Sequence, residues 1–257
     1  MFGFKKRRRN KLYQTPLPQS WISVLKMNVP LYNRLPPADQ IELGGHIQIF
    51  LAEKLFEGCR GLQITDEIRL TIAAQACILL LHRQTDYYPG LTSILVHPQA
   101  YHATNRRHIG DGVIIEGDEV RLGESWHRGS VVLSWEDVKR NSDAHSNAQN
   151  VVLHEFAHQI DISGGQGDSS PVLQQAKSFA QWASTLQENY EQLCADIMAD
   201  RPTVLDDYGA TNPAEFFAVT TECFFENPHQ LKQYHPELYA ELKEFYQQDP
   251  ATYIKML

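Results

Sequence analysis

Apolar residues in the first third of the chain recur every three or four positions, the spacing of one face of an α-helix. This pattern predicts helices over residues 21–28, 37–56 and 66–82. Pro37 suits the first turn of the second helix, and Thr65 suits the cap of the third. The chain between residues 20 and 85 is therefore predicted to be mainly helical.

The middle of the chain changes to short runs of apolar and β-branched residues separated by Gly, Pro and Asp. Such runs predict strands over residues 92–96, 112–115, 120–122 and 130–135. Helical spacing then returns, at about 136–141, 147–161, 172–197, 213–226 and 235–247. We expect an α+β fold in which a small mixed sheet packs on the 147–161 helix, between mostly helical N- and C-terminal parts. The strand at 130–135 fits an exposed edge beside a cleft and an interior position equally well.

The N-terminus differs from the rest of the chain in charge. Five of the 23 basic residues form the run Lys5 to Arg9, so the other 18 stand against all 31 acidic residues, a formal charge of −13. An acidic body argues against direct nucleic-acid binding. We expect residues 1–19 to be a flexible basic arm containing two prolines. Residues 20–257 are expected to form one domain, with a helical part at about 20–85 and a sheet and site part at about 90–257.

Targeting signals and cysteine spacing indicate where in the cell the protein is expected and whether it is expected to have disulfides. No apolar stretch of signal-peptide length follows the basic run, and the longest apolar run, Ile78 to Leu81, is too short to span a bilayer. The four cysteines are scattered without CxxC spacing, which indicates neither a disulfide framework nor a cysteine metal site. We expect a cytoplasmic protein without a membrane span.

The most specific pattern in the chain is HExxH, at His154, Glu155 and His158. Histidines at i and i+4 of a helix project from the same face, so both rings can bind one Zn²⁺, and the Glu can act as base on a water. A surface helix with two solvated histidines is the alternative. The apolar neighbours of the motif argue against it, because they predict a buried helix whose polar groups need partners. We therefore expect one Zn²⁺ per chain, with Glu155 as the general base.

A catalytic zinc site needs a third protein ligand. Asp161 stands where the long metzincin motif requires Gly, and Lys177 and Ser178 stand where a thermolysin-like enzyme places Glu. Glu215 remains, in the first turn of the helix that Asn212 caps. An acid in this apolar turn is either the third ligand or a residue that complements the helix dipole.

Two segments make the chain recognisable: HEFAHQID at 154–161, and NPAEFFAV at 212–219 just after Tyr208. Together with a softer N-terminal match, they resemble the Mlc titration factor A family of bacterial zinc peptidases, which shares its active-site plan with anthrax lethal factor. The resemblance covers most of the chain. It implies a zincin-like catalytic domain, His154, His158 and Glu215 as zinc ligands, Glu155 as base, and Tyr208 as the phenol that stabilises the oxyanion.

The resemblance also implies an activity and a partner. The expected activity is that of a zinc metallopeptidase, aminopeptidase-like, acting on peptides. The expected partner is the transcriptional repressor Mlc, through which the protein would modulate glucose phosphotransferase genes. The alternative is a regulatory protein that sequesters a repressor and has an idle or switch-like zinc site.

Two further acids near the predicted site have open roles. Asp161 either accepts the outer N–H of a ligand His or caps the Gly-rich loop 163–170. Glu222 lies on the helical face of Glu215, and either contacts the zinc shell or a substrate amine, or is solvated.

Overall fold

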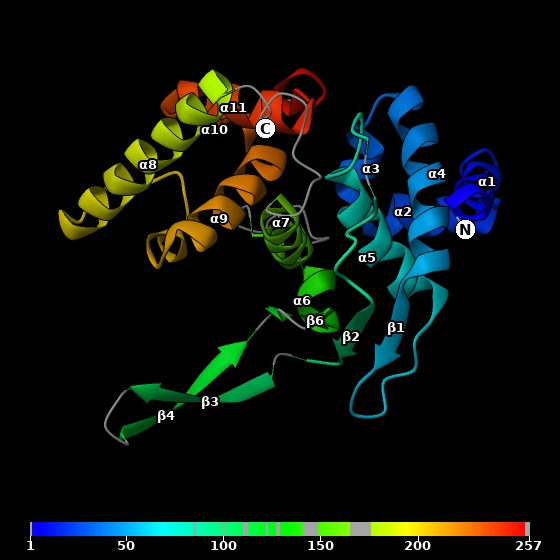
Figure 1. Cartoon of the computed structure of the whole chain (residues 1–257), viewed down its shortest axis with the longest axis horizontal. Helices are drawn as coiled ribbons and strands as arrows, with labels where there is room; N and C mark the ends of the chain where they lie inside the picture. Colours follow the sequence, from blue (N-terminus) through cyan, green and yellow to red (C-terminus); the bar gives the residue numbers. More distant parts are fainter. Residues whose placement is uncertain are drawn as a thin grey trace.

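The computed structural model combines many helices with two small sheets (Figure 1). It describes residues 2–84, 86–99, 101–109, 113–121, 123–126, 129–140, 149–164 and 176–254. The predicted α+β class agrees with this architecture. Within the ranges just given, no helix combines the length and apolarity needed to cross a membrane.

The first third of the chain is mainly helical, as predicted, and its helices gather on one side of the molecule (Figure 1). The predicted helix over 37–56 is too long, because it ends at Glu53 and residues 55–58 form a strand instead. They are α1 (Phe2–Tyr13), α2 (Gln19–Asn28), α3 (Pro30–Arg34), α4 (Pro37–Glu53) and α5 (Asp66–Ile78). Pro37 is in the first turn of α4, and the Thr65 hydroxyl accepts the N–H of Ile68 at 3.3 Å to cap α5. Pro37 and Thr65 therefore begin the two helices at the positions that the sequence predicts.

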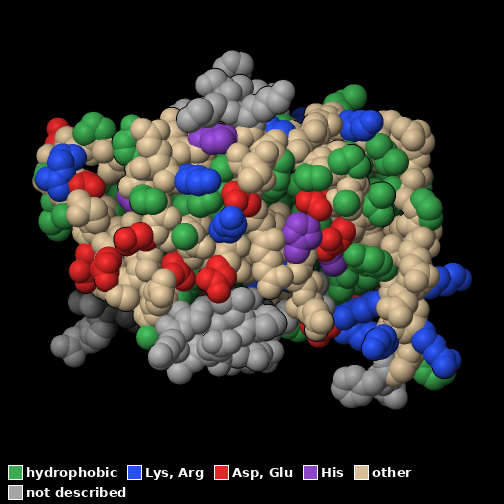
Figure 2. All heavy atoms as spheres, turned by 90° about the horizontal axis from the view of Figure 1, so that it is seen from above, with side chains coloured by type: hydrophobic (Ala, Val, Ile, Leu, Met, Phe, Trp, Pro, Cys, Tyr) green, Lys and Arg blue, Asp and Glu red, His purple; other side chains and the backbone are tan. Residues whose placement is uncertain are grey.

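Helix α1 corrects the expectation of a flexible arm over residues 1–19. Its Arg9 donates to both carboxylate oxygens of Glu53 at 2.7 Å, and to Asp86 at 2.5 Å. Tyr13 packs so closely against α4 that a Cβ at Gly45 would lie 2.7 Å from its ring. These contacts join residues far apart in the sequence, so local composition did not reveal them. Figure 2 shows Lys and Arg side chains gathered at the end of the molecule where α1 lies.

The main sheet has the order β1–β2–β6–β5. β1 (Leu55–Gly58), β2 (Ser93–His97) and β6 (Ser130–Ser134) are parallel, and β5 (Gly123–Trp126) is antiparallel to β6. The sheet is thus mixed, as expected, and the predicted strand at 130–135 is an interior strand. The predicted strands at 112–115 and 120–122 are one strand, β4 (Val113–Arg121), which pairs with β3 (Tyr101–Ile109) in a hairpin apart from the main sheet (Figure 1).

Helix α7 (Val151–Gly164) lies between the N-terminal helices and a second helical group formed by the last third of the chain (Figure 1). Short helix α6 (Trp135–Arg140) leads from β6 toward it. The second group comprises α8 (Ala176–Met198), the 3-10 turn η1 (Asp207–Ala210), α9 (Pro213–Glu226), α10 (Pro228–Tyr234), α11 (Pro236–Tyr246) and the turn η2 (Pro250–Thr252). β5 and β6 also contact α7, so the sheet packs on this helix.

One side of α7 packs against the hydrophobic core that the N-terminal part of the chain forms. Phe156 is fully buried, with its ring centroid 5.7 Å from that of Phe50 on α4 and 4.9 Å from that of Tyr88. On another side α7 packs along α9. Residues on the face of α7 toward α9 are thereby held opposite residues of α9. Cys77 and Cys223 are buried and Cys59 and Cys194 partly so, all as free thiols.

Candidate metal centre

His154 and His158 lie one turn apart on α7, as the motif spacing predicts. Their Nε2 atoms are 3.2 Å apart, and their rings are nearly perpendicular, at 84°. Each side chain is 14 % exposed, so both rings sit in a partly closed environment. The two nitrogens therefore converge on one point at the surface of α7.

Glu215 reaches the same point from α9. Its Oε2 lies 2.9 Å from Nε2 of His154 and 3.3 Å from Nε2 of His158. The start of α9 is fixed by Asn212, whose Oδ1 accepts the N–H groups of Ala214 at 2.9 Å and Glu215 at 3.0 Å. The structure thus brings together the three residues proposed as ligands, although Glu215 lies 61 and 57 positions after the two histidines.

This donor set fits a zinc ion. Zinc–nitrogen and zinc–oxygen bonds of about 2.1 Å in tetrahedral geometry separate the ligand atoms by about 3.4 Å. The three donor atoms here are 2.9, 3.2 and 3.3 Å apart. Two imidazoles and one carboxylate are also a ligand set of catalytic zinc sites, which leave a fourth position for water.

A second cluster, Asp39, Glu42 and His82, also gathers within metal-ligand distance but is a different kind of site. Nδ1 of His82 donates to the carbonyl oxygen of Gln247 at 2.9 Å, and Nε2 donates to Asp39 at 3.0 Å. An imidazole that donates through both nitrogens has no lone pair for a metal. This cluster is a charged hydrogen-bonded link between α4 and the end of α11.

The electrostatics of the HExxH site favour a cation. Burial alone would lower the pKa of His154, but the hydrogen bonds to Glu215 and Glu222 outweigh it and raise that pKa to about 10. Burial acts to raise the pKa of Glu215, yet its bonds to the two histidines bring that pKa down to about 2. The carboxylates therefore hold positive charge at this point, and a metal ion that binds there replaces the proton between His154 and Glu215.

Glu155 and Tyr208 are the other two residues that the sequence predicts for the site. Glu155 follows His154 on α7 and is 4 % exposed. Tyr208 is in η1, is 50 % exposed, and has its ring centroid 6.0 Å from that of His154. Asp206 caps η1 by accepting the Tyr208 N–H at 2.9 Å, and it accepts from Gln149, just before α7, at 2.8 Å. The predicted phenol is thus tied to the helix that carries the motif.

Of the two acids with open roles, Glu222 contacts the site. Its Oε1 accepts from Nδ1 of His154 at 2.7 Å. Asp161 is exposed, and among the hydrogen bonds of residues 149–161 none joins it to either imidazole. Glu222, and not Asp161, is therefore the carboxylate in contact with Nδ1 of His154. The loop 163–170 lies outside the described residues, apart from the end of α7.

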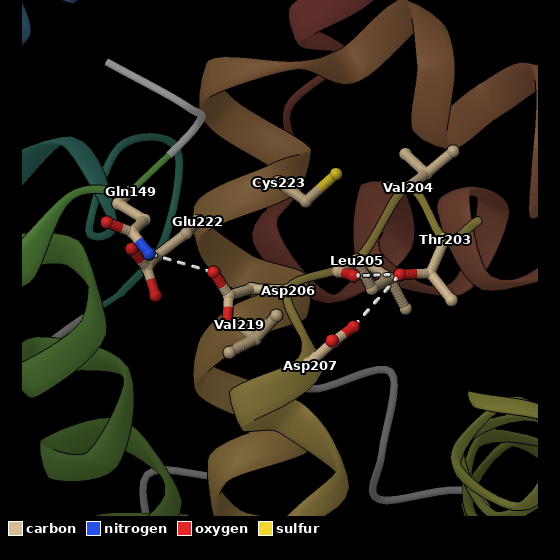
Figure 3. Close-up of a pocket in the computed structure, with 9 residues that line it drawn as sticks. All are labelled: Gln149, Thr203, Val204, Leu205, Asp206, Asp207, Val219, Glu222 and Cys223. Atoms are coloured by element: carbon tan, nitrogen blue, oxygen red, sulfur yellow. Dashed lines mark hydrogen bonds between the residues drawn. The ribbon is translucent and has the colours of Figure 1, made fainter. Parts of the chain in front are cut away.

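A cavity of about 360 Å³ lies beside the site, between the start of α7, the segment before Tyr208 and α9 (Figure 3). Glu222, Asp206 and Asp207 contribute carboxylates to its wall, and Figure 3 shows Asp206 joined to Gln149 across it. The lining does not include His154, His158 or Glu215. The cavity thus adjoins the Nδ1 side of His154.

Sequence reasoning missed the caps of α7 and η1 and the acid that contacts the α7 cap. Asn150 caps α7 by accepting the N–H of Leu153 at 3.2 Å, and Asp206 caps η1. Their signals were present, since Asn and Asp directly before a helix are preferred caps. Glu226, which accepts from the Asn150 side chain at 2.8 Å, carried no local signal.

Comparison with known proteins shows the family of this chain. The family model described as glucose-regulated metallo-peptidase M90 matches residues 4–247. An uncharacterised protein of Synechocystis is 41 % identical over 95 % of this chain and 89 % of its own length. Mlc titration factor A of Klebsiella pneumoniae is 31 % identical over 88 % of this chain and 86 % of its own, and that of Serratia proteamaculans is 30 % identical over 89 % and 87 %. The chain therefore belongs to the M90 family of glucose-regulated metallopeptidases, the family of Mlc titration factor A.

Proposed function

We propose that this protein is a zinc-dependent peptidase of the aminopeptidase type with a zincin-like catalytic domain, which holds one Zn²⁺ on His154, His158 and Glu215. The observation that carries the proposal is the convergence of two Nε2 atoms and one carboxylate oxygen within 3.3 Å of one another. Membership of a metallopeptidase family supports it. A peptide is then the substrate that the site takes.

The metal and two nearby residues have separate roles in the proposed hydrolysis. Zinc, when bound, supplies a Lewis acid that polarises the peptide carbonyl and brings the pKa of water toward 7. Glu155 takes the proton of the attacking water and later delivers it to the leaving amine. The Tyr208 hydroxyl donates a hydrogen bond to the developing oxyanion. The exposure of Tyr208 suits this role, because its hydroxyl must reach substrate.

The direct test compares the wild type with Glu155→Gln in zinc content and in hydrolysis of aminoacyl p-nitroanilides and their N-acetylated forms. Loss of a general base costs about 10²–10⁴-fold in turnover, and zinc should stay at one per chain. Glu237→Gln, an exposed acid on α11, is the matched control and should keep full activity. Cleavage restricted to free amino termini supports an aminopeptidase. Turnover that survives in Glu155→Gln refutes the mechanism.

We also propose that the protein binds the repressor Mlc, and so acts on glucose phosphotransferase gene expression in the cytoplasm. The name of the Klebsiella and Serratia relatives, which align over most of this chain, supports this second role. Sequestration of Mlc needs only a binding surface, whereas cleavage of Mlc needs Glu155 as the general base. Purified Mlc should therefore bind Glu155→Gln as tightly as the wild type. Absence of binding by both proteins would exclude the role.

A further inference from the structure

Helix α9 contacts His154 from both sides of its ring. Glu215 accepts from Nε2 at 2.9 Å, and Glu222 accepts from Nδ1 at 2.7 Å. Seven residues make almost two full turns of a helix, so the two acids lie on one face of α9, about 10.5 Å apart along its axis. The imidazole is held between them.

Glu222 has a second contact, at the beginning of α7. Its Oε2 accepts the backbone N–H of Asn150, a hydrogen bond between buried groups. Asn150 is the residue whose side chain caps α7 through the N–H of Leu153. One carboxylate thus joins the cap of the motif helix to the first histidine of the motif.

The surroundings of Glu222 leave it few other partners. The residue is 7 % exposed, and Asn150 is 2 % exposed. Among the ion pairs that the structure describes, Glu222 has one, with His154. Burying a carboxylate is costly unless it is paired and hydrogen-bonded, so a displaced His154 ring would leave this charge poorly compensated. The orientation of the ring and the position of the acid therefore stabilise each other.

We propose that Glu222 is a positioning residue for the metal site: it keeps the proton of His154 on Nδ1, so that the Nε2 lone pair points at the metal, and it anchors the start of α7. This inference rests on the proposed zinc site. A carboxylate on the outer nitrogen of a ligand histidine fixes the tautomer and raises the basicity of the ligand, and its removal typically costs about 10–100-fold in metal affinity.

The test is the zinc dissociation constant of each variant, measured by competition with a chromophoric chelator. Glu222→Ala should bind zinc about 10–100-fold more weakly than the wild type. Glu222→Gln should lose less, because its amide oxygen still accepts from Nδ1 while its NH2 group cannot accept from Asn150. Glu226→Gln, which alters the other acid at Asn150 and does not touch His154, is the matched control and should stay close to the wild type.

A second readout separates positioning from folding. In zinc-loaded protein, imidazole ¹⁵N–¹H spectra should show a slowly exchanging Nδ1–H of His154 in the wild type and in Glu226→Gln, and faster exchange in Glu222→Ala. Unfolding midpoints measured with chelator show whether each variant is folded. A folded Glu222→Ala with wild-type zinc affinity and an unchanged Nδ1–H signal overturns this inference alone. If Glu222→Ala does not fold, wild-type zinc affinity in Glu222→Gln overturns it instead. A wild type that binds no zinc overturns the proposed function as well.

Discussion

Replacing Asn212 by Ala should destabilise the start of the helix that carries Glu215. Pro213 has no N–H, so the first donors of α9 that need an acceptor are those of Ala214 and Glu215, and Asn212 accepts both, at 2.9 and 3.0 Å. Alanine removes the acceptor and leaves the two N–H groups to water. The substitution therefore tests whether this cap fixes the ligand-bearing turn.

The expected cost follows from known cap energetics. Exchange of an Asn cap for Ala costs about 1 kcal/mol, within a range of roughly 0.5–2 kcal/mol. In a chain of this size, 1 kcal/mol lowers the melting temperature by about 2–4 °C. Asn212→Ser keeps an acceptor oxygen and should lose only a few tenths of a kcal/mol. Zinc affinity should also fall in Asn212→Ala, because the turn that orients Glu215 frays.

The chain offers a matched control in Asn227. It also precedes a proline at the start of a helix, α10, but its side chain makes no capping bond there. Urea and thermal unfolding, followed by circular dichroism in the presence of chelator, should rank the variants as Asn212→Ala below Asn212→Ser, with Asn227→Ala near the wild type. Equal losses in Asn212→Ala and Asn227→Ala, or none in Asn212→Ala, would refute the capping argument.

Three other outcomes are expected. Phe156→Ala should cost about 3–5 kcal/mol in urea unfolding, because the ring is fully buried against Phe50 and Tyr88, and a loss below 1 kcal/mol would contradict that packing. Tyr208→Phe should lower kcat by about 10²-fold at unchanged zinc content, and unchanged kcat would remove it from the mechanism. Burial lowers the pKa of His82, but its bonds to Gln247 and Asp39 outweigh this and raise it above 6.5. Its stabilisation is therefore full below pH 6.5 and lost as pH rises through the folded pKa, so the stability gap to His82→Gln should shrink from pH 6 to pH 9. A constant gap would contradict the charged link.

The sequence predicted the parts of this protein that depend on local patterns. The apolar residues around the HExxH motif predict α7, and Asn212 and Pro213 predict the start of α9. The convergence of Glu215 on the two histidines agrees with the expected ligand set, although spacing alone left a dipole role open. Where helix caps and apolar periodicity decide the structure, the sequence is sufficient.

Other features depend on contacts between distant segments and were not predictable in this way. α1 is a basic segment with few apolar residues, and the ion pairs of Arg9 with Glu53 and Asp86 reach across 44 and 77 residues. The interior position of β6 depends on β5, a four-residue strand too short to recognise from sequence. Glu222 was recognised as a candidate from its position relative to Glu215, but its partner nitrogen required the structure.

Titration of metal-depleted protein with zinc, while hydrolysis of an aminoacyl p-nitroanilide is followed, tests the proposed metal site most directly. Activity should rise linearly and level off at one zinc per chain in the wild type. Glu215→Ala and His158→Ala should bind zinc weakly and stay inactive across the same range. Full activity in the metal-depleted wild type, or wild-type zinc binding by Glu215→Ala, would contradict the assignment of this site.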